Sequence, residues 1–316
     1  MTVIALSGGV GGAKLALGLY RALPPDRLTV IVNTGDDFDH LGLRICPDLD
    51  TVLYTLAELD HPAQGWGRHD ETWTLMRALE SLGGDTWFRL GDGDAALHLV
   101  RTAKLRRDIS LTDIMREFRT RLGIAAQILP MTDSRIETRI DTDEGELAFQ
   151  DYFVRRRCEP HVRAIRFVGA AQAESTASVR AAFADDALEA IIVCPSNPYL
   201  SIDPLLSVES LRAALASRRV PAIAVSPLIG GAAVKGPTAK IMRELGIEST
   251  PASIAAHYQD LIDALIVDTS DSAEALGLGL PSYPTSTLMR TIDDRIRLAR
   301  FTLRCTHELR PPRRPT

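Results

Sequence analysis

The chain has 316 residues, of which 45% are hydrophobic, and its formal net charge at neutral pH is −5. This length allows one large α/β domain with an insertion, or two modest domains. The acidic balance argues against a general nucleic-acid surface.

Cysteine usage and hydropathy exclude further classes of protein. The four cysteines are widely spaced and form no CxxC pair or Cys/His cluster, which argues against a structural zinc site and a disulfide framework. No apolar run reaches about 18 residues, and the N-terminus lacks the pattern of a signal peptide. We therefore expect a soluble cytoplasmic protein that does not contact a membrane.

The first motif is a glycine-rich loop between an apolar run at 3–6 and a helical pattern that ends near Leu23. Its sequence is Ser-Gly-Gly-Val-Gly-Gly-Ala-Lys (7–14). A strand, a glycine loop and a helix in this order offer free backbone N–H groups to a phosphate. Candidate phosphate contacts are therefore Gly9, Gly11, Gly12 and Lys14. The loop matches neither GxGxxG nor GxxxxGK[ST], and a tight turn for helix–strand packing is the alternative interpretation.

The second motif is an acidic cluster that follows a predicted strand at 28–32. Asn33-Thr34-Gly35-Asp36-Asp37-Phe38-Asp39 begins the cluster, and Pro47-Asp48-Leu49-Asp50 continues it at a predicted helix start. A short extended piece is predicted between them, at 41–45. A nicotinamide-binding fold needs one carboxylate here for a ribose, so several carboxylates favour a metal ion or a polyhydroxylated ligand. The alternative is that these residues cap helices or are solvated, since aspartates suit the first turn of a helix.

Residues 60–125 are predicted to form a helical insertion, with helices near 70–82, 92–106 and 111–122. The insertion holds all three tryptophans, Trp66, Trp73 and Trp87. They form either a roof over an aromatic ligand or a small core. Arg89, between two of these helices, is either a ligand contact or a surface charge.

The remainder of the chain resumes an α/β pattern after one antiparallel element. A strand at 128–131 ends at Thr132, and alternation across Asp143-Glu144-Gly145 predicts a β-hairpin at about 134–157. A strand at 190–193 ends at Ser196 and Asn197. A strand at 222–225 ends in a second glycine loop with a helix after Pro237; its candidate phosphate contacts are Ser226, Gly230, Gly231, Lys235 and Gly236.

These elements predict a Rossmann-like α/β fold, with a parallel sheet and helices on both faces. We expect one domain over 1–304, closed by a helix at 289–304, and a basic, disordered tail at 305–316. Two glycine loops facing carboxylates suit a nucleotide di- or triphosphate with a divalent metal, which we expect to be Mg²⁺. One carboxylate would accept a proton from an attacking hydroxyl.

Taken in order, several segments resemble the 2-phospho-L-lactate transferase family of coenzyme F(420) biosynthesis. The resemblance covers nearly the whole chain except the tail, and its specificity lies in the ordered set rather than in one motif. The segments are Ser-Gly-Gly-Val-Gly-Gly-Ala-Lys (7–14), Asn-Thr-Gly-Asp-Asp-Phe (33–38), Leu-Arg-Ile-Cys-Pro-Asp-Leu-Asp-Thr (43–51), Met-Thr-Asp (131–133), Cys-Pro-Ser-Asn-Pro (194–198) and Ser-Pro-Leu-Ile-Gly-Gly-Ala-Ala-Val-Lys-Gly-Pro (226–237).

The resemblance implies a reaction and a division of roles. A guanosine-diphosphate-activated three-carbon acid gives its phosphate to the ribityl hydroxyl of the deazaflavin Fo, and GMP leaves. Asp50 and Arg89 match positions that resemble deazaflavin contacts, and Asp50 with Asp36 is our choice for catalysis and metal binding. Asp37 and Asn33 would assist, Thr132 would line the substrate site, and the loops at 8–14, 196–198 and 226–236 would hold the guanosine diphosphate. The resemblance also implies a homodimer.

Two other classes of function compete with the transferase. A non-catalytic nucleotide-sugar-binding regulator of the same superfamily shares the glycine loop, but Pro-Asp-Leu-Asp at 47–50 favours the transferase. An NAD-dependent oxidoreductase is disfavoured by the missing GxGxxG and by the additional carboxylates. The sequence leaves open which three-carbon acid is transferred.

Overall fold

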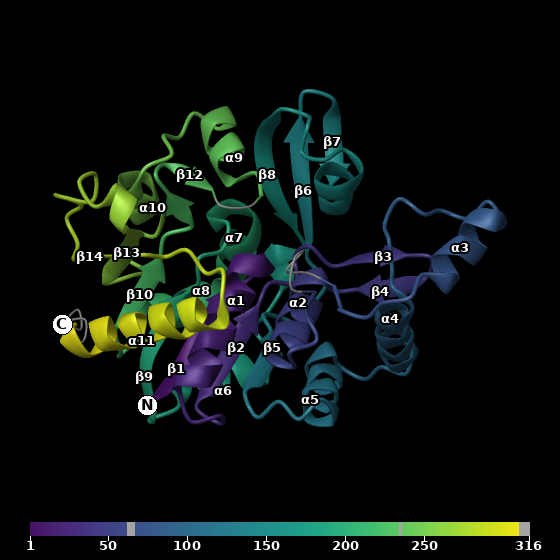
Figure 1. Cartoon of the computed structure of the whole chain (residues 1–316), viewed down its shortest axis with the longest axis horizontal. Helices are drawn as coiled ribbons and strands as arrows, with labels where there is room; N and C mark the ends of the chain where they lie inside the picture. The colour runs from purple at the N-terminus through teal and green to yellow at the C-terminus, as the bar shows by residue number, and fades with distance from the viewer. Residues whose placement is uncertain (62–66, 234–235, 310–316) are drawn as a thin grey trace.

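A seven-stranded parallel β-sheet forms the centre of the molecule in a computed structural model (Figure 1), which describes residues 1–61, 67–233 and 236–309. This sheet confirms the predicted Rossmann-like α/β class. Buried runs of β-branched and aliphatic residues form its central strands, as expected when helices cover both faces. The seven strands are β1 (Thr2–Ser7), β2 (Leu28–Val32), β5 (Gln127–Pro130), β9 (Leu188–Val193), β10 (Ala222–Val225), β13 (Ala264–Asp268) and β14 (Ser282–Thr285).

The order of the strands places a switch point between β1 and β9. The order across the sheet is β14-β13-β10-β9-β1-β2-β5, and every neighbouring pair is parallel. From β1 the chain adds β2 and β5 on one side, and it later adds β9, β10, β13 and β14 on the other. Ligands of open α/β sheets bind at the carboxyl ends of the strands at such a point.

Helices cover both faces of the sheet. Alternate residues of each strand point to opposite faces, so Val3 and Ala5 belong to one core while Ile4 and Leu6 belong to the other. The first core includes α1 (Gly9–Ala22), α2 (Pro47–Leu56), α5 (Leu111–Arg121) and α11 (Ile292–Glu308). The second includes α6 (Ala177–Ala184), α7 (Asp203–Leu206), α8 (Glu209–Ala216), α9 (Thr238–Glu244) and α10 (Pro251–His257).

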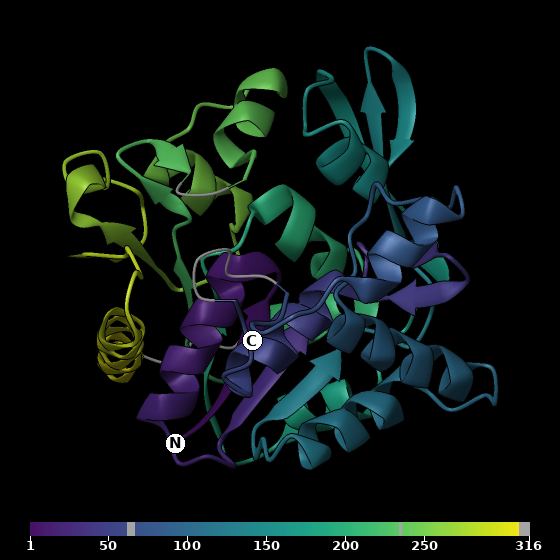
Figure 2. The ribbon, with the colours of Figure 1, turned by 45° about the vertical axis from the view of Figure 1, so that its right-hand side comes forward.

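Two additions flank the sheet. The first, which we call the arm, projects to the right in Figure 1 and comes forward in Figure 2; it consists of β3 (Phe38–His40), β4 (Leu43–Ile45), α3 (Thr74–Ser81) and α4 (Asp92–Leu105). The second is an antiparallel sheet of β6 (Glu137–Thr142), β7 (Gly145–Ala148) and β8 (Val162–Val168). Short helical turns occupy Asp151–Arg155, Ala170–Gln172, Pro198–Ile202 and Thr269–Asp271.

Three expected elements differ from the observed ones. The predicted hairpin at 134–157 ends at Ala148, and β8 pairs with β6 to make a three-stranded sheet. The extended piece predicted at 41–45 is one strand of the β3–β4 hairpin. The closing helix runs over Ile292–Glu308 rather than 289–304, because buried Cys305 and Thr306 continue its packed face into the predicted tail. Residues 310–316 lie outside the described residues.

No helix in the described part of the chain is both long and apolar enough to cross a membrane.

Candidate functional site

The two loops at the switch point are joined directly to each other. The hydroxyl of Ser196, after β9, accepts a hydrogen bond from the Gly8 N–H (3.2 Å) and donates one to the Gly8 carbonyl (2.7 Å). Ser196 is therefore fixed by the glycine loop after β1. The predicted loops at 7–14 and 194–198 form one continuous wall of the site.

Close packing between these loops explains two of the glycines. A β-carbon on Gly11 would lie 2.3 Å from the carbonyl oxygen of Pro195. A β-carbon on Gly12 would lie 2.4 Å from the Ser7 hydroxyl and 2.6 Å from that of Ser196. All three distances are too short for a side chain at these positions, so the glycines are explained by packing whether or not a phosphate binds.

The N-terminus of α1 still presents backbone donors. Gly9, with a left-handed φ of +62°, donates its N–H to Oδ1 of Asp48 at 2.8 Å. Among the residues that the structure describes, no acceptor serves the N–H groups of Val10 and Gly11. A helix N-terminus with free donors attracts anions through both hydrogen bonding and the helix dipole.

Asp36, Asp48 and Asn33 form one half of the acidic cluster. Asn33 Nδ2 donates to Oδ2 of Asp48 at 3.0 Å, and Asn33 Oδ1 accepts the Gly35 N–H at 2.7 Å. Both aspartates are buried, and within the described chain Oδ1 of Asp36 lacks a hydrogen-bond partner. Burial raises the pKa of Asp48 to about 6. Burial, and then repulsion from Asp48, raise the pKa of Asp36 well above its usual range.

This half of the cluster fits a divalent metal ion. Two adjacent buried carboxylates repel each other, and either a proton or a cation between them relieves the repulsion. Carboxylate oxygens are also the ligands that Mg²⁺ prefers. The orphaned oxygen of Asp36 is a candidate ligand, with the Asp48 carboxylate beside it.

Asp37 lies between the two halves of the cluster. Its carboxylate is buried, and the nearest cation is Arg44, with Nη2 3.9 Å from Oδ2. Neither of its oxygens has a hydrogen-bond partner among the described residues. Burial raises the pKa of Asp37 to about 7, against the opposing attraction of Arg44.

Asp50 belongs to the second half and is paired with Arg101 of α4. Arg101 is completely buried, and its guanidinium faces the carboxylate with both terminal nitrogens. Nη1 donates to Oδ2 at 3.0 Å, and Nη2 donates to Oδ1. The sequence predicted that Asp36 and Asp50 share a metal; the structure instead brings Asp36 to Asp48 and Asp50 to Arg101.

His98 and Asp94 complete the second half. Ligand atoms of Asp50, Asp94 and His98 all lie within 4.8 Å of one another. His98 Nε2 lies 3.3 Å from Asp94 Oδ2, and the Tyr54 hydroxyl donates to Asp94 Oδ1 at 2.7 Å. The sequence placed Asp48 in the acidic cluster without a role of its own, and it did not indicate Asp94, His98 or Arg101. The available signal was the spacing of positions 94, 98 and 101, which share one helix face.

The second glycine loop has its turn amides occupied. It forms a hairpin of β11 (Leu228–Ile229) and β12 (Ala232–Ala233), and the turn residues Gly230 and Gly231 both have positive φ. Their N–H groups donate to the Asp271 carboxylate at 3.0 and 2.9 Å. A phosphate at this turn must therefore compete with Asp271.

The flanking residues of this loop are placed as follows. Ser226 Oγ accepts the Leu228 N–H at 3.2 Å. Lys235 lies outside the described residues. Gly236, with φ +76°, comes just before the N-cap of α9.

Thr132 and Asn197 are held by local hydrogen bonds. The Thr132 hydroxyl donates to the Glu174 carbonyl at 2.6 Å and accepts the Ser134 N–H at 3.0 Å. Asn197 Oδ1 accepts two backbone N–H groups of the turn that follows it, at 3.0 and 3.1 Å. Its Nδ2 is buried without a partner in the described chain, so this amide has a donor available for a ligand.

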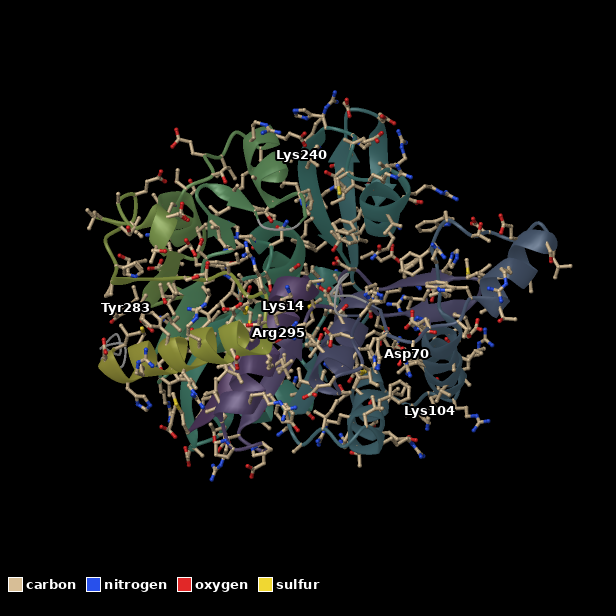
Figure 3. All side chains as sticks on the ribbon, in the orientation of Figure 1. Lys14, Asp70, Lys104, Lys240, Tyr283 and Arg295 are labelled. Carbon is tan, nitrogen blue, oxygen red and sulfur yellow. The ribbon has the colours of Figure 1, made fainter. Side chains whose placement is uncertain are left out.

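Two of the three predicted cationic contacts, Lys14 and Arg89, lie on different elements. Lys14 of α1, labelled in Figure 3, donates from Nζ to the Met289 carbonyl at 3.1 Å, in the segment that leads to α11. Arg89 is exposed on the arm, where its guanidinium carbon lies 4.3 Å from the centre of the Trp73 ring.

The tryptophans of the arm pack among other aromatic rings. Trp73 is half-buried against the small core of the arm, and Trp87 contacts Phe38, His40 and Phe88 with centroid distances of 5.3–6.2 Å. This packing favours the small-core interpretation for both. Trp66 lies outside the described residues.

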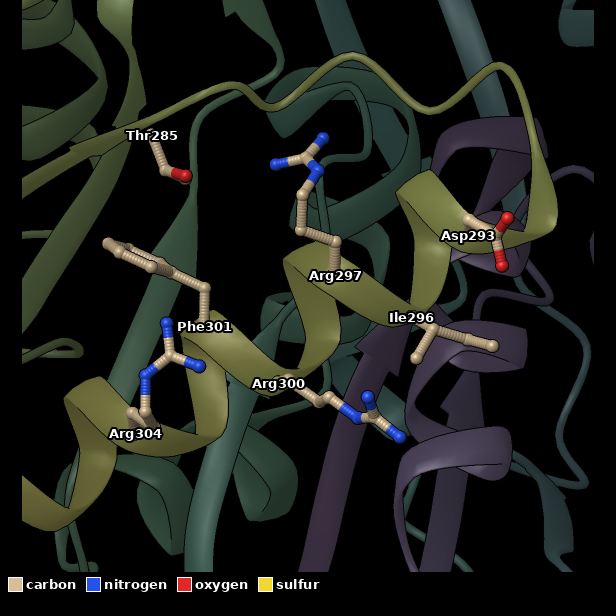
Figure 4. Close-up of a pocket in the computed structure, with 7 residues that line it drawn as sticks. All are labelled: Thr285, Asp293, Ile296, Arg297, Arg300, Phe301 and Arg304. Atoms are coloured by element: carbon tan, nitrogen blue, oxygen red, sulfur yellow. The ribbon is translucent and has the colours of Figure 1, made fainter.

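A separate hollow of about 490 Å³ runs along α11 (Figure 4). None of the predicted site residues lines it. Its lining residues are Thr285, Asp293, Ile296, Arg297, Arg300, Phe301 and Arg304.

The chain is similar to known proteins in both sequence and structure. A sequence profile described as "2-phospho-L-lactate transferase CofD" matches residues 3–278. A phosphoenolpyruvate transferase of Kitasatospora aureofaciens is 40% identical, covering 98% of this chain and 99% of the relative. A 2-phospho-L-lactate transferase of Methanopyrus kandleri is 41% identical, covering 96% and 97%. A solved UPF0052-family structure from Bacillus halodurans has a TM-score of 0.63 at 14% identity, covering 96% and 100%, a likeness of fold alone.

Proposed function

The chain belongs to the 2-phospho-L-lactate transferase family, and from that premise we propose its complete reaction. A phospho-three-carbon-acid group moves from its guanosine-diphosphate-activated form to the deazaflavin Fo, with release of GMP. This reaction is a step of coenzyme F(420) biosynthesis.

One observation supports this proposal most. Four buried aspartates, Asp36, Asp37, Asp48 and Asp50, follow the carboxyl end of β2, and one of them touches the N-terminus of α1. Donors for phosphate and acceptors for a metal or a hydroxyl proton therefore meet at the switch point of the sheet. Phosphoryl transfer to an alcohol requires this combination, because its catalysis is mainly positioning and electrostatic stabilisation.

The reaction is an in-line displacement at the acid-linked phosphorus. The terminal ribityl hydroxyl of Fo attacks this phosphorus, and a phosphodiester bond forms. The bond to the bridging oxygen breaks, and that oxygen leaves as part of the GMP phosphate. Asp50 accepts the proton of the attacking hydroxyl, and free N–H groups of α1 together with Asn197 Nδ2 bind phosphate oxygens.

Mg²⁺ is the cofactor that we propose for this step. Asp36 and Asp48 would hold it, because their buried carboxylates repel each other and, among the residues that the structure describes, no cation is paired with either of them. Mg²⁺, when bound, neutralises negative charge on the transferring phosphoryl group. Asp37 remains close enough to contribute through its negative charge.

The names of the relatives give two different three-carbon acids, so we propose the class of donor rather than the compound. Relatives named for phosphoenolpyruvate and for 2-phospho-L-lactate are 40% and 41% identical to this chain. Donors that differ by a double bond or a hydroxyl require only small changes in a pocket. By the same family argument, we propose a cytoplasmic homodimer.

A reconstituted assay tests the function. The protein is incubated with Fo, Mg²⁺, GTP, a purified activating enzyme and one of three acids: 2-phospho-L-lactate, phosphoenolpyruvate or phosphoglycerate. We expect the phosphodiester product and GMP in equal amounts, measured by mass spectrometry. A reaction without the activating enzyme is the control. Binding of a nucleotide sugar without product from any donor would indicate the regulator instead.

A further inference from the structure

Arg101 is a buried cation that the proposed reaction does not use directly. It lies on α4, and its side chain is fully buried between the carboxylate of Asp50 and the ring of Phe118, 5.9 Å from the guanidinium carbon. A buried ion pair costs desolvation free energy and is weak support for a fold. The presence of this pair inside the acidic cluster therefore requires another explanation.

The guanidinium occupies a position suited to a metal ion. Asp50, Asp94 and His98 have ligand atoms within 4.8 Å of one another, which is the spacing of a three-ligand site. Arg101 Nη1 lies 3.0 Å from Oδ2 of Asp50 and 3.2 Å from Nδ1 of His98. One nitrogen of the guanidinium thus bridges two of the three groups.

The other members of the cluster orient this guanidinium. Because Arg101 can only donate, Nδ1 of His98 must accept, which leaves the ring proton on Nε2 facing Asp94. Asp94 in turn accepts from the Tyr54 hydroxyl. A continuous set of contacts therefore runs from Tyr54 through Asp94 and His98 to Arg101 and Asp50.

We propose that Arg101 is a positioning residue. Its guanidinium occupies the position that a metal ion would take among Asp50, Asp94 and His98, and it thereby keeps Asp50 free of metal. Its planar fork fixes both oxygens of Asp50 in one orientation, which a hydrated metal ion does not do. The metal is then confined to the Asp36 and Asp48 half, and Asp50 is directed to the hydroxyl of the acceptor. This inference rests on the proposed function for the role of Asp50.

The chain contains a matched pair with a structural role only. Arg218 is 5% exposed and donates to both oxygens of Asp263, at 3.2 and 2.7 Å. Asp263 also accepts the Ala222 N–H at the start of β10, at the amino end of the sheet. Arg218→Met therefore removes a comparably buried arginine that also pairs with both oxygens of one aspartate, but away from the site.

The first test counts bound metal. The full-length protein, Arg101→Met and Arg218→Met are titrated with Mn²⁺, and bound ions per chain are measured by electron paramagnetic resonance. We expect one additional Mn²⁺ per chain in Arg101→Met alone, and its loss when His98→Ala is added. Equal counts in Arg101→Met and Arg218→Met would overturn the proposal.

The second test uses Arg101→Lys, which keeps a buried positive charge but loses the fork. We expect an unchanged Mn²⁺ count, an unchanged KM for the activated acid, and a loss of about 100-fold in kcat/KM for the deazaflavin, the scale of a reacting group misplaced by about 1 Å. Wild-type kinetics in Arg101→Lys would overturn the positioning role. This test remains valid if Arg101→Met does not fold.

The two proposals fail in distinguishable ways. A wild-type protein that makes no product from any donor contradicts the proposed function, while the Mn²⁺ counts still decide whether Arg101 excludes a metal. If the wild type makes product but the Arg101 variants have the same metal counts and the same kinetics as the wild type, only the role of Arg101 is contradicted.

Discussion

Asp48 and Asp50 lie two positions apart in the first turn of α2, yet their carboxylates meet opposite electrostatic conditions. Asp48 faces a second carboxylate, Asp36, and its compensation comes from neutral donors on Asn33 and Gly9. Asp50 instead forms an ion pair with the guanidinium of Arg101. The same short segment therefore supplies one carboxylate that needs a cation and one that already has one.

The geometry of a helix explains this contrast. Residues two apart in an α-helix point about 200° away from each other, so the two side chains leave α2 on opposite sides. One side meets α1 and the residues after β2, and the other meets α4 of the arm. A helix that begins at the carboxyl edge of the sheet thus separates a metal-binding task from a proton-accepting task.

The largest expected effect comes from Asp50→Asn. We expect kcat to fall by about 10²–10⁴-fold, the usual range for loss of a general base, while Mn²⁺ binding is retained. Steady-state kinetics and a metal titration measure the two quantities. Near-normal turnover would mean that Asp50 pairs with Arg101 but does not act as a general base.

The second prediction is that substitutions in the two halves of the cluster change the free energy of unfolding in opposite directions. Asp36→Asn removes a repelling carboxylate, so we expect the free energy of unfolding without metal to rise by about 1 kcal/mol at pH 7.5. Asp50→Asn leaves Arg101 buried and unpaired, so we expect a loss of about 3–5 kcal/mol. Urea denaturation in the presence of a chelator measures both changes in the free energy of unfolding. Changes of the same sign would contradict the difference between the two halves of the cluster.

The third prediction concerns pH and Asp37, which lies between the halves. Its pKa is raised from 3.8 to about 7, so between these values the folded state binds more protons than the unfolded state. Its contribution to stability is therefore present at low pH and lost as pH rises. Relative to Asp37→Asn, we expect the wild type to lose about 1.4 kcal/mol per pH unit from pH 5 to 7.

Unfolding by urea at pH 5, 6 and 7 checks this slope. The exposed Asp113, which pairs with Arg116 on the surface of α5, offers a control variant, Asp113→Asn. A pH-independent difference between Asp37→Asn and the wild type would mean that Asp37 stays ionised throughout this range.

The sheet and its loops could be predicted because their signals are local. The apolar run at 28–32 has the same bounds as β2, and strands predicted to end at 131, 193 and 225 end at 130, 193 and 225, because these runs stop at polar turns. The aspartates after β2 were therefore located correctly at the edge of the sheet. Burial on both faces makes such strands continuous in sequence.

The pairing of the carboxylates could not be predicted, because it depends on tertiary packing. Arg101 is one of many arginines in the chain, and the docking of α4 against β4, α2 and α5 buries it. The β3–β4 hairpin could not be predicted from the sequence for a different reason. Its turn places Leu41 at φ +53° before Gly42, and a leucine in the left-handed region gives no turn signal.

Two strands were missed because they lack the usual patterns. β8 has a mostly half-buried or exposed sequence with two arginines, and β14 is a four-residue edge strand that contains Pro284. Proline is tolerated there because the edge leaves one side without a strand partner. Edge elements of this kind contribute little to the site.

The two hydrogen bonds between Ser196 and Gly8 have a consequence for how the protein is made. They join residues 188 positions apart, and the pairing of β1 with β9, as between Val3 and Ala190, has a similar separation. A ribosome synthesising about 5–20 residues per second completes β1, β2 and all four aspartates well before the other wall of the site exists. The nascent chain therefore carries the acidic edge with only one wall of the site until β9 docks, and long-range closure of this kind is the slow part of folding. Binding competence is thus among the last properties that this chain acquires.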